Sequence, residues 1–456
     1  MRKSNTLSLM VLVLLSVNAV LNIRGLPLFA HIGLQALGFY GLAAIGFLIP
    51  SSLASAELAA RVGKEGGVYA WVSAAFGKKI GFIAIYLEWI NNVIGFPATL
   101  STIAATLLYF IFPNVSEHRG VFFLLMMGIL WSLTWINLRG VKPSAHFSSL
   151  GSLFGTILPG IWVILLGILW FLWQRPIGFL IHSASIFPPL EFSSLSLWVG
   201  VMGALSGMQI IGFHFQNIEN PKKTFPRVML ISVVLILFLS LGAIFSMSAV
   251  VPPQHLNVMA GVIQMYEVFF HSVGWDWILG IFVVLLSFGM MASMNAWILG
   301  PARGLQTAAK AGHLPTFFAR LSHHQVPRNI LIVQSIISSV LALLFLIMPS
   351  FKEVFWILIA LMGQFTVLMY VLIFASLLCL NFKEKIRPQV IPFGKMGLLV
   401  VGLLGLSSCV LAFMVGVFPP AQLGFPSTSA FVWRMVFIDG LILGVPFLLS
   451  LKLWKE

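Results

Sequence analysis

Long apolar segments separated by short polar ones repeat along the whole chain. Most of these segments hold about 20 residues or more, the length a helix needs to cross the roughly 30 Å hydrocarbon core of a bilayer. The pattern therefore predicts about twelve membrane-spanning helices. They lie at 5–33, 37–60, 81–112, 119–139, 150–173, 194–217, 225–251, 275–307, 328–348, 353–380, 396–418 and 429–451. Because no loop could hold a soluble domain, we expect residues 1–456 to form one transmembrane domain.

Two connecting segments have a pattern of their own. Glycines stand beside aromatic residues in the segment 61–79, which predicts a tight turn at the membrane surface and a short helix. In the segment 252–275, apolar residues follow a pair of prolines at helical spacing: Val262, Met265, Val268 and Phe269. This spacing predicts an external amphipathic helix that serves as a lid.

Two of the predicted helices contain interruptions that a helix facing lipid would not tolerate. A charge, a glycine and a proline stand within the first (IRGLP, 23–27), and a glutamine lies between glycines in the sixth (SGMQIIG, 206–212). Broken backbone inside a bilayer must line a cavity, because lipid cannot satisfy its free N–H and C=O groups. Five helices separate the two breaks, so the core, residues 5–380, reads as a five-plus-five inverted repeat with two extra helices at 396–451. The alternative is a pair of glycine-rich packing contacts.

Composition and charge support a membrane protein. Only 8% of the residues are charged and 59% are hydrophobic, whereas soluble domains average about 25% charged residues. The net charge is +14, and the basic residues are distributed unequally across the membrane. With a cytoplasmic amino terminus, 21 of the 26 Lys and Arg residues lie on the cytoplasmic side. That asymmetry is the positive-inside rule, so the basic balance needs no nucleic acid as partner. We expect a multi-pass inner-membrane protein with both termini in the cytoplasm.

Several segments resemble the amino acid-polyamine-organocation (APC) superfamily of transporters. The segments are EGGVYAWV (65–72), NIENPKKTFP (217–226), GPARG (300–304) and GHLP (312–315). Within that superfamily the chain looks closest to the bacterial glutamate/GABA antiporters, through IRGLP (23–27), AGVIQ (260–264) and WILGPARG (297–304). The likeness runs from about residue 6 to residue 450, and the order and spacing of the motifs make it specific.

The resemblance implies a LeuT-type, all-α fold that works by alternating access, with substrate held between helices one, three, six, eight and ten. Carried over by position, it implies these substrate-binding residues: Ile23, Arg24, Gly25, Leu26, Pro27, Ser206, Gly207, Met208, Gln209, Ile210, Trp297 and Tyr370. Most would act through backbone groups, and we expect Gly25 and Gly207 to supply the close approach and unusual dihedral angles of such a site. One departure is Ile211, which replaces the acidic residue of many relatives, so recognition of a basic side chain is not expected there.

Three ionisable residues within the predicted helices require an explanation. An unpaired arginine at the bilayer centre costs at least about 2.5 to 3.5 kcal/mol, so Arg24 either borders the substrate cavity or pairs within the break. Glu88 is a candidate partner for Arg24 or a proton-carrying group, and an interfacial position is the alternative. His214 is a second coupling candidate because histidine titrates near neutral pH, although a packing role is the more usual one.

The function that these features favour is secondary active transport of an amino acid, by antiport or with proton coupling. The alternatives are an amino acid sensor on a transporter scaffold and a polyamine or amine exchanger. A membrane-embedded enzyme is disfavoured because the sequence contains no HExxH helix, GxSxG elbow or nucleotide-binding loop. Cys379 and Cys409 lack metal-ligand spacing and are interpreted as packing residues, so we expect no metal and no cofactor. Arg434 and Asp439 would serve structure or a contact with a second copy in a homodimer.

Overall fold

The computed structural model describes most of the chain. The described residues are 9–21, 25–62, 67–109, 118–177, 186, 191, 195–210, 221–252, 255–257, 259–383, 390–419 and 427–453. Within these ranges the protein is all-helical, and ten helices are long and apolar enough to cross a membrane. The predicted positions of the ten are confirmed to within a few residues at most of their ends.

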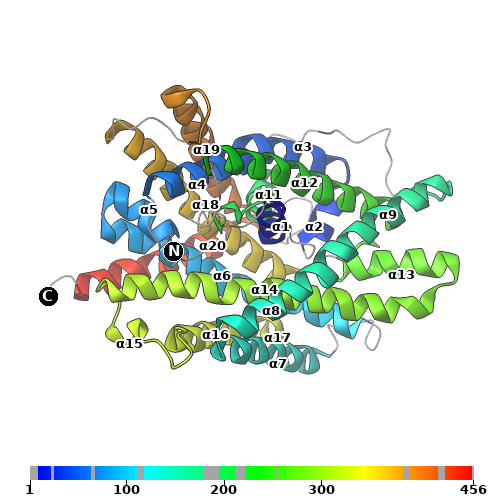
Figure 1. The fold of residues 1–456 in the computed structure, drawn as a ribbon. Coiled ribbons are helices and arrows are strands. Elements are labelled where there is room, and N and C mark those ends of the chain that lie inside the picture. Colours follow the sequence, from blue (N-terminus) through cyan, green and yellow to red (C-terminus); the bar gives the residue numbers. More distant parts are fainter. Residues whose placement is uncertain are drawn as a thin grey trace, which may run out of the picture.

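The ten candidate spans alternate with short connections. They are Gln35–Val62 (α3, η2 and α4), Lys78–Leu108 (α6), Arg119–Leu138 (α7), His146–Leu172 (most of α8, with η4 and α9), Pro226–Val250 (most of α12), Asp276–Lys310 (η7 and α14), Arg328–Ile347 (α16 and α17), Phe351–Phe382 (most of α18), Gly394–Gly416 (α19) and Thr428–Pro446 (most of α20). In Figure 1 the long helix α14 runs from one end of the molecule to the other.

Two further helices are interrupted, at the places where the sequence predicts breaks. The first helix is divided into α1 (Leu9–Val20) and α2 (Leu26–Ala30). The sixth begins as α11 (Leu197–Ala204), and only a short 3₁₀ turn at 208–210 follows it among the described residues. Both α1 and α11 lie in the middle of the molecule in Figure 1, surrounded by the continuous helices.

Polar residues extend the fifth helix beyond its predicted start at residue 150. The α8 helix begins at Val141 (Val141–Ser152), followed by the π-helical turn η4 (Leu153–Ile157) and by α9 (Leu158–Leu172). Asn295 of α14 donates hydrogen bonds to the carbonyl oxygen and the hydroxyl of Ser144 at 3.0 and 2.9 Å, and Asn137 of α7 completes the cluster. Ser144 is buried, and its satisfied hydrogen bonds stabilise this turn of the helix although the hydropathy of the segment is low.

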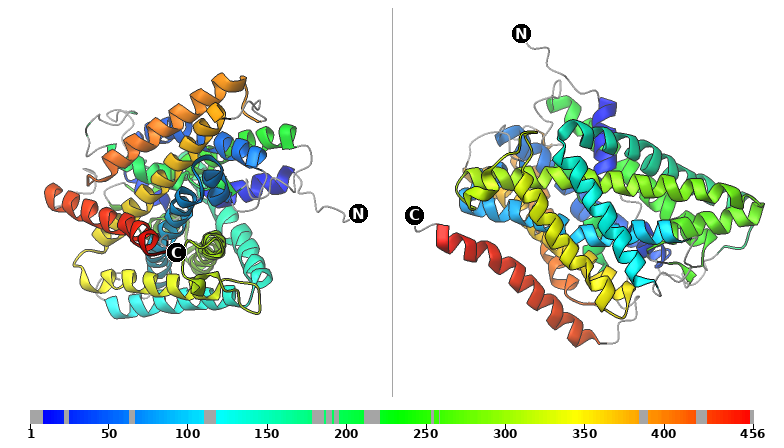
Figure 2. Two further views of the ribbon diagram at one scale, coloured as in Figure 1. Left: turned by 90° about the vertical axis from the view of Figure 1, so that its left-hand side faces the viewer. Right: turned by 90° about the horizontal axis from the view of Figure 1, so that it is seen from below.

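The two ends of the bundle carry different short helices. The expected short helix after span two is α5 (Gly67–Phe76), and α15 (Thr316–Ala319) lies at the same end of the bundle in Figure 1. The amphipathic helix predicted within 252–275 is α13 (Gly261–Val273), at the opposite end. It buries Val262, Met265 and Phe269 as the spacing predicts. The carboxy-terminal end of α20 (Thr428–Leu453) lies at the α5 end of the bundle, as Figures 1 and 2 both show.

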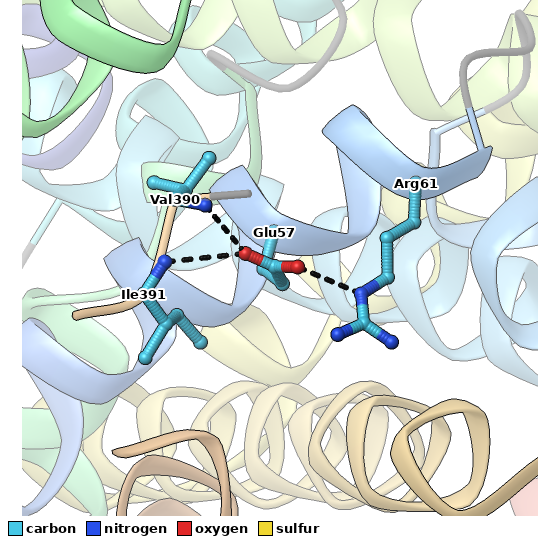
Figure 3. A network of polar contacts seen from close by, with 4 residues as sticks. All are labelled: Glu57, Arg61, Val390 and Ile391. Atoms are coloured by element: carbon cyan, nitrogen blue, oxygen red, sulfur yellow. Dashed lines mark hydrogen bonds and ion pairs between the residues drawn. The ribbon is translucent and has the colours of Figure 1, made fainter. Parts of the chain in front are cut away.

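A buried charge cluster fastens α4 (Ile49–Val62) to the segment that precedes α19 (Figure 3). The Glu57 carboxylate accepts hydrogen bonds from the backbone N–H groups of Val390 and Ile391 at 2.8 and 3.2 Å. Its other oxygen lies 2.7 Å from Nε of Arg61, and both charged side chains are almost completely buried. The Glu57 carboxylate therefore joins two segments that are 333 residues apart in the sequence.

Candidate functional site

A cavity opens between five helices at the centre of the bundle. The space between its lining atoms amounts to about 680 Å³, including the part that is open to solvent. Its walls come from α1, α6, α11 with the turn that follows it, α14 (Leu279–Lys310) and α18 (Phe351–Lys383). The lining residues are Ala19, Val20, Leu21, Asn91, Asn92, Gly95, Phe96, Thr99, Gly203, Ala204, Ser206, Gln209, Ser293, Met294, Trp297, Met362 and Thr366.

Both interrupted helices end at this cavity with their carboxyl termini. Ala19 and Val20 close α1, and Gly203 and Ala204 close α11; all four line the cavity. The last carbonyl groups of a helix have no partner within the helix and carry the negative end of its dipole. Two such ends beside one cavity suit the ammonium group of a ligand.

The two breaks touch at Gly207. Its φ angle is +125°, and a Cβ atom there would lie 2.8 Å from the carbonyl oxygen of Ala19. Any other residue would therefore combine a strained backbone with a collision against the end of α1. Gly25 differs from Gly207, because its φ is −85° and a Cβ atom would meet only Phe29, at 4.0 Å. The expectation that Gly25 supplies an unusual dihedral angle is wrong, since its backbone is in the ordinary helical region.

A chain of hydrogen bonds connects the break in helix six to a buried carboxyl group. The backbone N–H of Gly207 donates to the hydroxyl oxygen of Tyr370 at 3.3 Å, and that hydroxyl donates to Oε1 of Gln209. Nε2 of Gln209 lies 3.5 Å from Oε1 of Glu88, a long hydrogen bond. Glu88, Gln209 and Tyr370 are all at least 97% buried. The chain joins residues of α6, α18 and the helix-six break.

The structure brings part of the predicted site together. Ser206, Gln209 and Trp297 line the cavity directly, and Tyr370 lies one hydrogen bond behind Gln209. Met208 is fully buried next to the break without lining the cavity. Ile210 is half-buried and does not line it either. Three of the predicted residues, Ile23, Arg24 and His214, lie outside the described residues.

The second half of helix one is turned away from the described cavity. Pro27 packs against α13, since a Cβ atom on Gly261 would lie 2.7 Å from its side chain. The Ser248 hydroxyl of α12 (Pro221–Val250) donates to the carbonyl oxygen of Ala30 at 2.8 Å. Gly25, Leu26 and Pro27 therefore do not line the cavity, and helix one contributes Ala19, Val20 and Leu21 to it instead.

Sequence reasoning missed much of the polar wall of the cavity. Asn91, Asn92 and Thr99 of α6 line it, as do Ser293 of α14 and Thr366 of α18. The signal for the first three was a row of polar residues at helical spacing in an otherwise apolar helix. Nδ2 of Asn92 donates to the backbone oxygen of Glu88 at 2.8 Å, which leaves its Oδ1 available to accept from a ligand.

The polar residues that line the cavity carry hydrogen-bonding amide and hydroxyl groups. No group of three or more His, Cys, Asp or Glu side chains gathers anywhere in the described ranges. None of the lining residues is charged, so the cavity of the described structure is polar but neutral in its own side chains. Such a site can hold a small zwitterion through amide, hydroxyl and carbonyl groups.

Comparison with known proteins gives consistent matches over almost the whole chain. Residues 7–442 match the family described as amino acid permease. An uncharacterized transporter of Legionella pneumophila is 35% identical over 449 residues, covering 97% of this chain and 96% of that protein. The glutamate/gamma-aminobutyrate antiporter of Lactococcus lactis subsp. lactis is 28% identical over 427 residues, with coverage of 91% and 84%. The protein of the same name in L. lactis subsp. cremoris is 31% identical over 330 residues, with coverage of 71% and 65%.

Proposed function

The chain belongs to the amino acid permease family, and on that premise we propose that it is a secondary carrier that moves amino acids by alternating access. Family membership and ten candidate spans make it a multi-pass inner-membrane protein that transports or exchanges amino acids and is not an enzyme. The coupling mode, antiport or proton coupling, belongs to the proposal.

The proposed architecture has twelve helices: ten form a LeuT-type inverted repeat of five plus five, and two extra helices follow it. Ten continuous candidate spans and two interrupted helices add up to that number. The interruptions fall in the first and the sixth helix, the first member of each proposed repeat of five. In such repeats, broken helices at the repeat interface form the substrate site.

The observation that carries the proposal is that both breaks border one cavity. The substrate ammonium group would lie at the carbonyl ends of α1 and α11, where the helix dipoles favour positive charge. The carboxylate would accept hydrogen bonds from amide N–H groups of other lining side chains, such as Asn91. Because lipid cannot satisfy broken backbone, a central cavity lined by two helix ends is difficult to explain as simple packing.

The substrate class that we propose is amino acids with acidic or neutral side chains. No lining residue in the described structure is acidic, so nothing there attracts a second positive charge strongly. Arg24, in the undescribed segment 22–24, adds a positive charge within helix one. The relatives named as glutamate/gamma-aminobutyrate antiporters are consistent with this class.

Counterflow in proteoliposomes tests the proposal. Vesicles that contain the purified protein are loaded with one unlabelled amino acid and exposed to labelled glutamate, γ-aminobutyrate, glutamine, leucine, arginine or agmatine. We expect rapid exchange of at least one acidic or neutral amino acid, and the Gly207→Ala variant serves as the inactive control. Exchange of agmatine without any amino acid would favour the amine exchanger. Saturable binding without counterflow would favour the sensor.

A further inference from the structure

We propose that Glu88 is the proton-binding group of this carrier. Its protonation rotates the side-chain amide of Gln209, at the helix-six break, so that the amide oxygen and nitrogen exchange places. The inference rests on the proposed transport function and assigns the proton coupling of the same site to a specific hydrogen-bond switch. It begins from the chain of contacts between Glu88, Gln209, Tyr370 and Gly207.

The arrangement suits an ionised Glu88. A carboxylate can only accept hydrogen bonds, so the amide must present its nitrogen, and Nε2 of Gln209 does face Oε1 of Glu88. The amide oxygen then points to the opposite side, where the hydroxyl of Tyr370 donates to it. The hydroxyl oxygen of Tyr370 remains free to accept from the backbone N–H of Gly207.

Protonation of Glu88 reverses the donor and acceptor roles along this chain. The neutral acid carries one O–H donor, and the best acceptor within reach is the amide oxygen of Gln209. The amide then turns by about half a rotation, which places Nε2 toward the oxygen of Tyr370. That oxygen now accepts from two N–H groups, and its own proton must find a new acceptor. The proton on Glu88 therefore changes the hydrogen bonds of Tyr370, whose oxygen accepts from Gly207 where the two broken helices touch.

No described cation neutralises Glu88, and its candidate partner Arg24 lies outside the described residues. The side chain is only 3% exposed, and no ion pair involves it in the described structure. The described titratable groups around the network are Tyr370 of α18 and the buried thiol of Cys409 on α19 (Gly394–Gly416), both uncharged at neutral pH. The indole N–H of the adjacent Trp89 is occupied by Gln334 of α16 at 3.0 Å. An isolated carboxylate at membrane depth is costly, so neutralisation from the cavity is favoured.

Gln209 connects this switch to the substrate because it lines the cavity directly, whereas Glu88 lies behind it. A proton from cavity water adds to the Glu88 carboxylate, and the same proton returns to cavity water when the cavity faces the other side. An ionised Glu88 attracts the substrate ammonium group and holds the amide in the observed orientation. A neutral Glu88 does neither, so we expect weaker substrate binding when it is protonated.

The test measures the KM for counterflow between pH 5 and 8, together with uptake driven by an imposed pH gradient. For the unmodified protein we expect KM to rise about tenfold as pH falls, the effect of losing one charge-assisted hydrogen bond. Glu88→Gln should show, at every pH, the high KM that the unmodified protein has at low pH, and it should lose uptake driven by the pH gradient. Tyr370→Phe should reduce the pH effect, because it removes the donor that fixes the amide oxygen of Gln209. Glu353→Gln, on the far part of α18, is the matched control and should keep the wild-type profile.

The outcomes separate this inference from the proposed function. Counterflow by the unmodified protein without any pH dependence, or a wild-type pH profile in Glu88→Gln, would overturn the proton switch and leave the transport function standing. Absence of counterflow for every amino acid would overturn the transport function itself. A second measurement does not depend on the variants: proton release or uptake on substrate binding, followed with a pH-sensitive dye in weakly buffered detergent solution. No proton exchange on binding would also overturn the switch.

Discussion

At the scale of single residues, Gly25 and Gly207 stand at the two helix interruptions but differ in whether the position requires glycine. Gly207 has a left-handed φ and faces the carbonyl oxygen of Ala19, whereas Gly25 has an ordinary φ and open space around it. Glycine is required only where its missing Cβ atom is used. The contact between Gly207 and the end of α1 joins the two breaks, so transport should depend on it.

We therefore expect Gly207→Ala to abolish counterflow and Gly25→Ala to retain most of it. The added methyl at residue 207 would lie 2.8 Å from the Ala19 oxygen, whereas at residue 25 the nearest atom is 4.0 Å away. Initial rates in proteoliposomes measure both variants at equal protein content. Equal activity of the two variants would show that the contact between the breaks is not needed.

Arg24 remains a prediction from the sequence, because it lies outside the described residues. A positive charge about 6 Å from a substrate side chain contributes on the order of 3 kcal/mol at an effective dielectric constant near 20, before desolvation and pairing. We expect Arg24→Gln to reduce competition by glutamate and aspartate selectively in the counterflow assay. An equal loss for every substrate, together with a lower denaturation temperature, would show that Arg24 is structural. Strong arginine or lysine transport by the unmodified protein would exclude the charge preference.

At the scale of helices and loops, two contacts fasten the α5 end of the bundle. The buried cluster of Glu57, Arg61 and the backbone at 390–391 joins α4 to the segment before α19 (Figure 3). His313 follows α14 and is inserted between α5 and α6: its ring stacks on Phe82 at 5.7 Å and meets Tyr69 at 6.4 Å. Both contacts bury polar groups, so they depend on complete pairing or on a neutral side chain.

Removal of the Glu57 carboxylate should strongly destabilise the protein. Breaking a buried, hydrogen-bonded pair costs about 3 to 5 kcal/mol, because the partner charge stays buried. The pair of Arg434 and Glu353, 3.0 Å apart with the arginine 55% exposed, is the matched surface control, for which about 0 to 1 kcal/mol is expected. Thermal denaturation in detergent should show a much larger loss for Glu57→Ala than for Glu353→Ala. Similar losses for both would contradict the role of the buried cluster.

Acid should loosen the junction at His313. Burial lowers the pKa of this histidine, and the nearby Lys78 and Lys79 lower it further. Because its folded-state pKa lies below the usual value of about 6.5, its contribution to stability is complete above that pH and is lost as pH falls below it. Neither ring nitrogen has a hydrogen-bond partner among the described residues. We expect the denaturation temperature to fall between pH 7 and 5, and to fall less in His313→Phe.

The exposed His323 provides the control for this experiment. His323→Phe should keep the wild-type dependence of the denaturation temperature on pH, because the exposed side chain of His323 fills no packed site. If the denaturation temperatures of His313→Phe and of the unmodified protein fall by the same amount between pH 7 and 5, the acid sensitivity arises elsewhere in the molecule.

At the scale of the whole molecule, the bundle has two distinct ends and a peripheral last helix. Figure 2 shows α20 along the outside of the bundle. It is attached by the pair of Arg434 and Glu353, and by Asp439, whose carboxylate lies 3.0 and 3.1 Å from the amide nitrogen of Gln364 when that amide is oriented to donate. Both groups are therefore engaged within the chain, as the structural alternative predicted, and the homodimer contact stays a prediction.

The orientation of the bundle follows from its charges and can be tested by labelling. Trp275, before α14, and Phe317, in α15, belong to opposite ends of the bundle, and each is 49% exposed. After replacement of Cys379 and Cys409, Trp275→Cys should react with a membrane-impermeant maleimide in intact cells. Phe317→Cys should react only after permeabilisation. The opposite result would invert the proposed topology and move both termini out of the cytoplasm.

The sequence by itself determined the class of protein, the positions of the spans and the two breaks. In the hydrocarbon core each segment must satisfy the hydrogen bonds of its own backbone. The length of an apolar segment, the charges that flank it and a Gly-x-Pro within it can therefore be interpreted from the local sequence alone. It could not determine which helix faces meet. Glu88 and Gln209 are 121 residues apart, Asn91, Asn92 and Thr366 share one cavity, and α2 turns toward α13. These facts depend on the rotation and lateral packing of many helices, which are fixed by contacts between distant segments and not by the local sequence of any one helix.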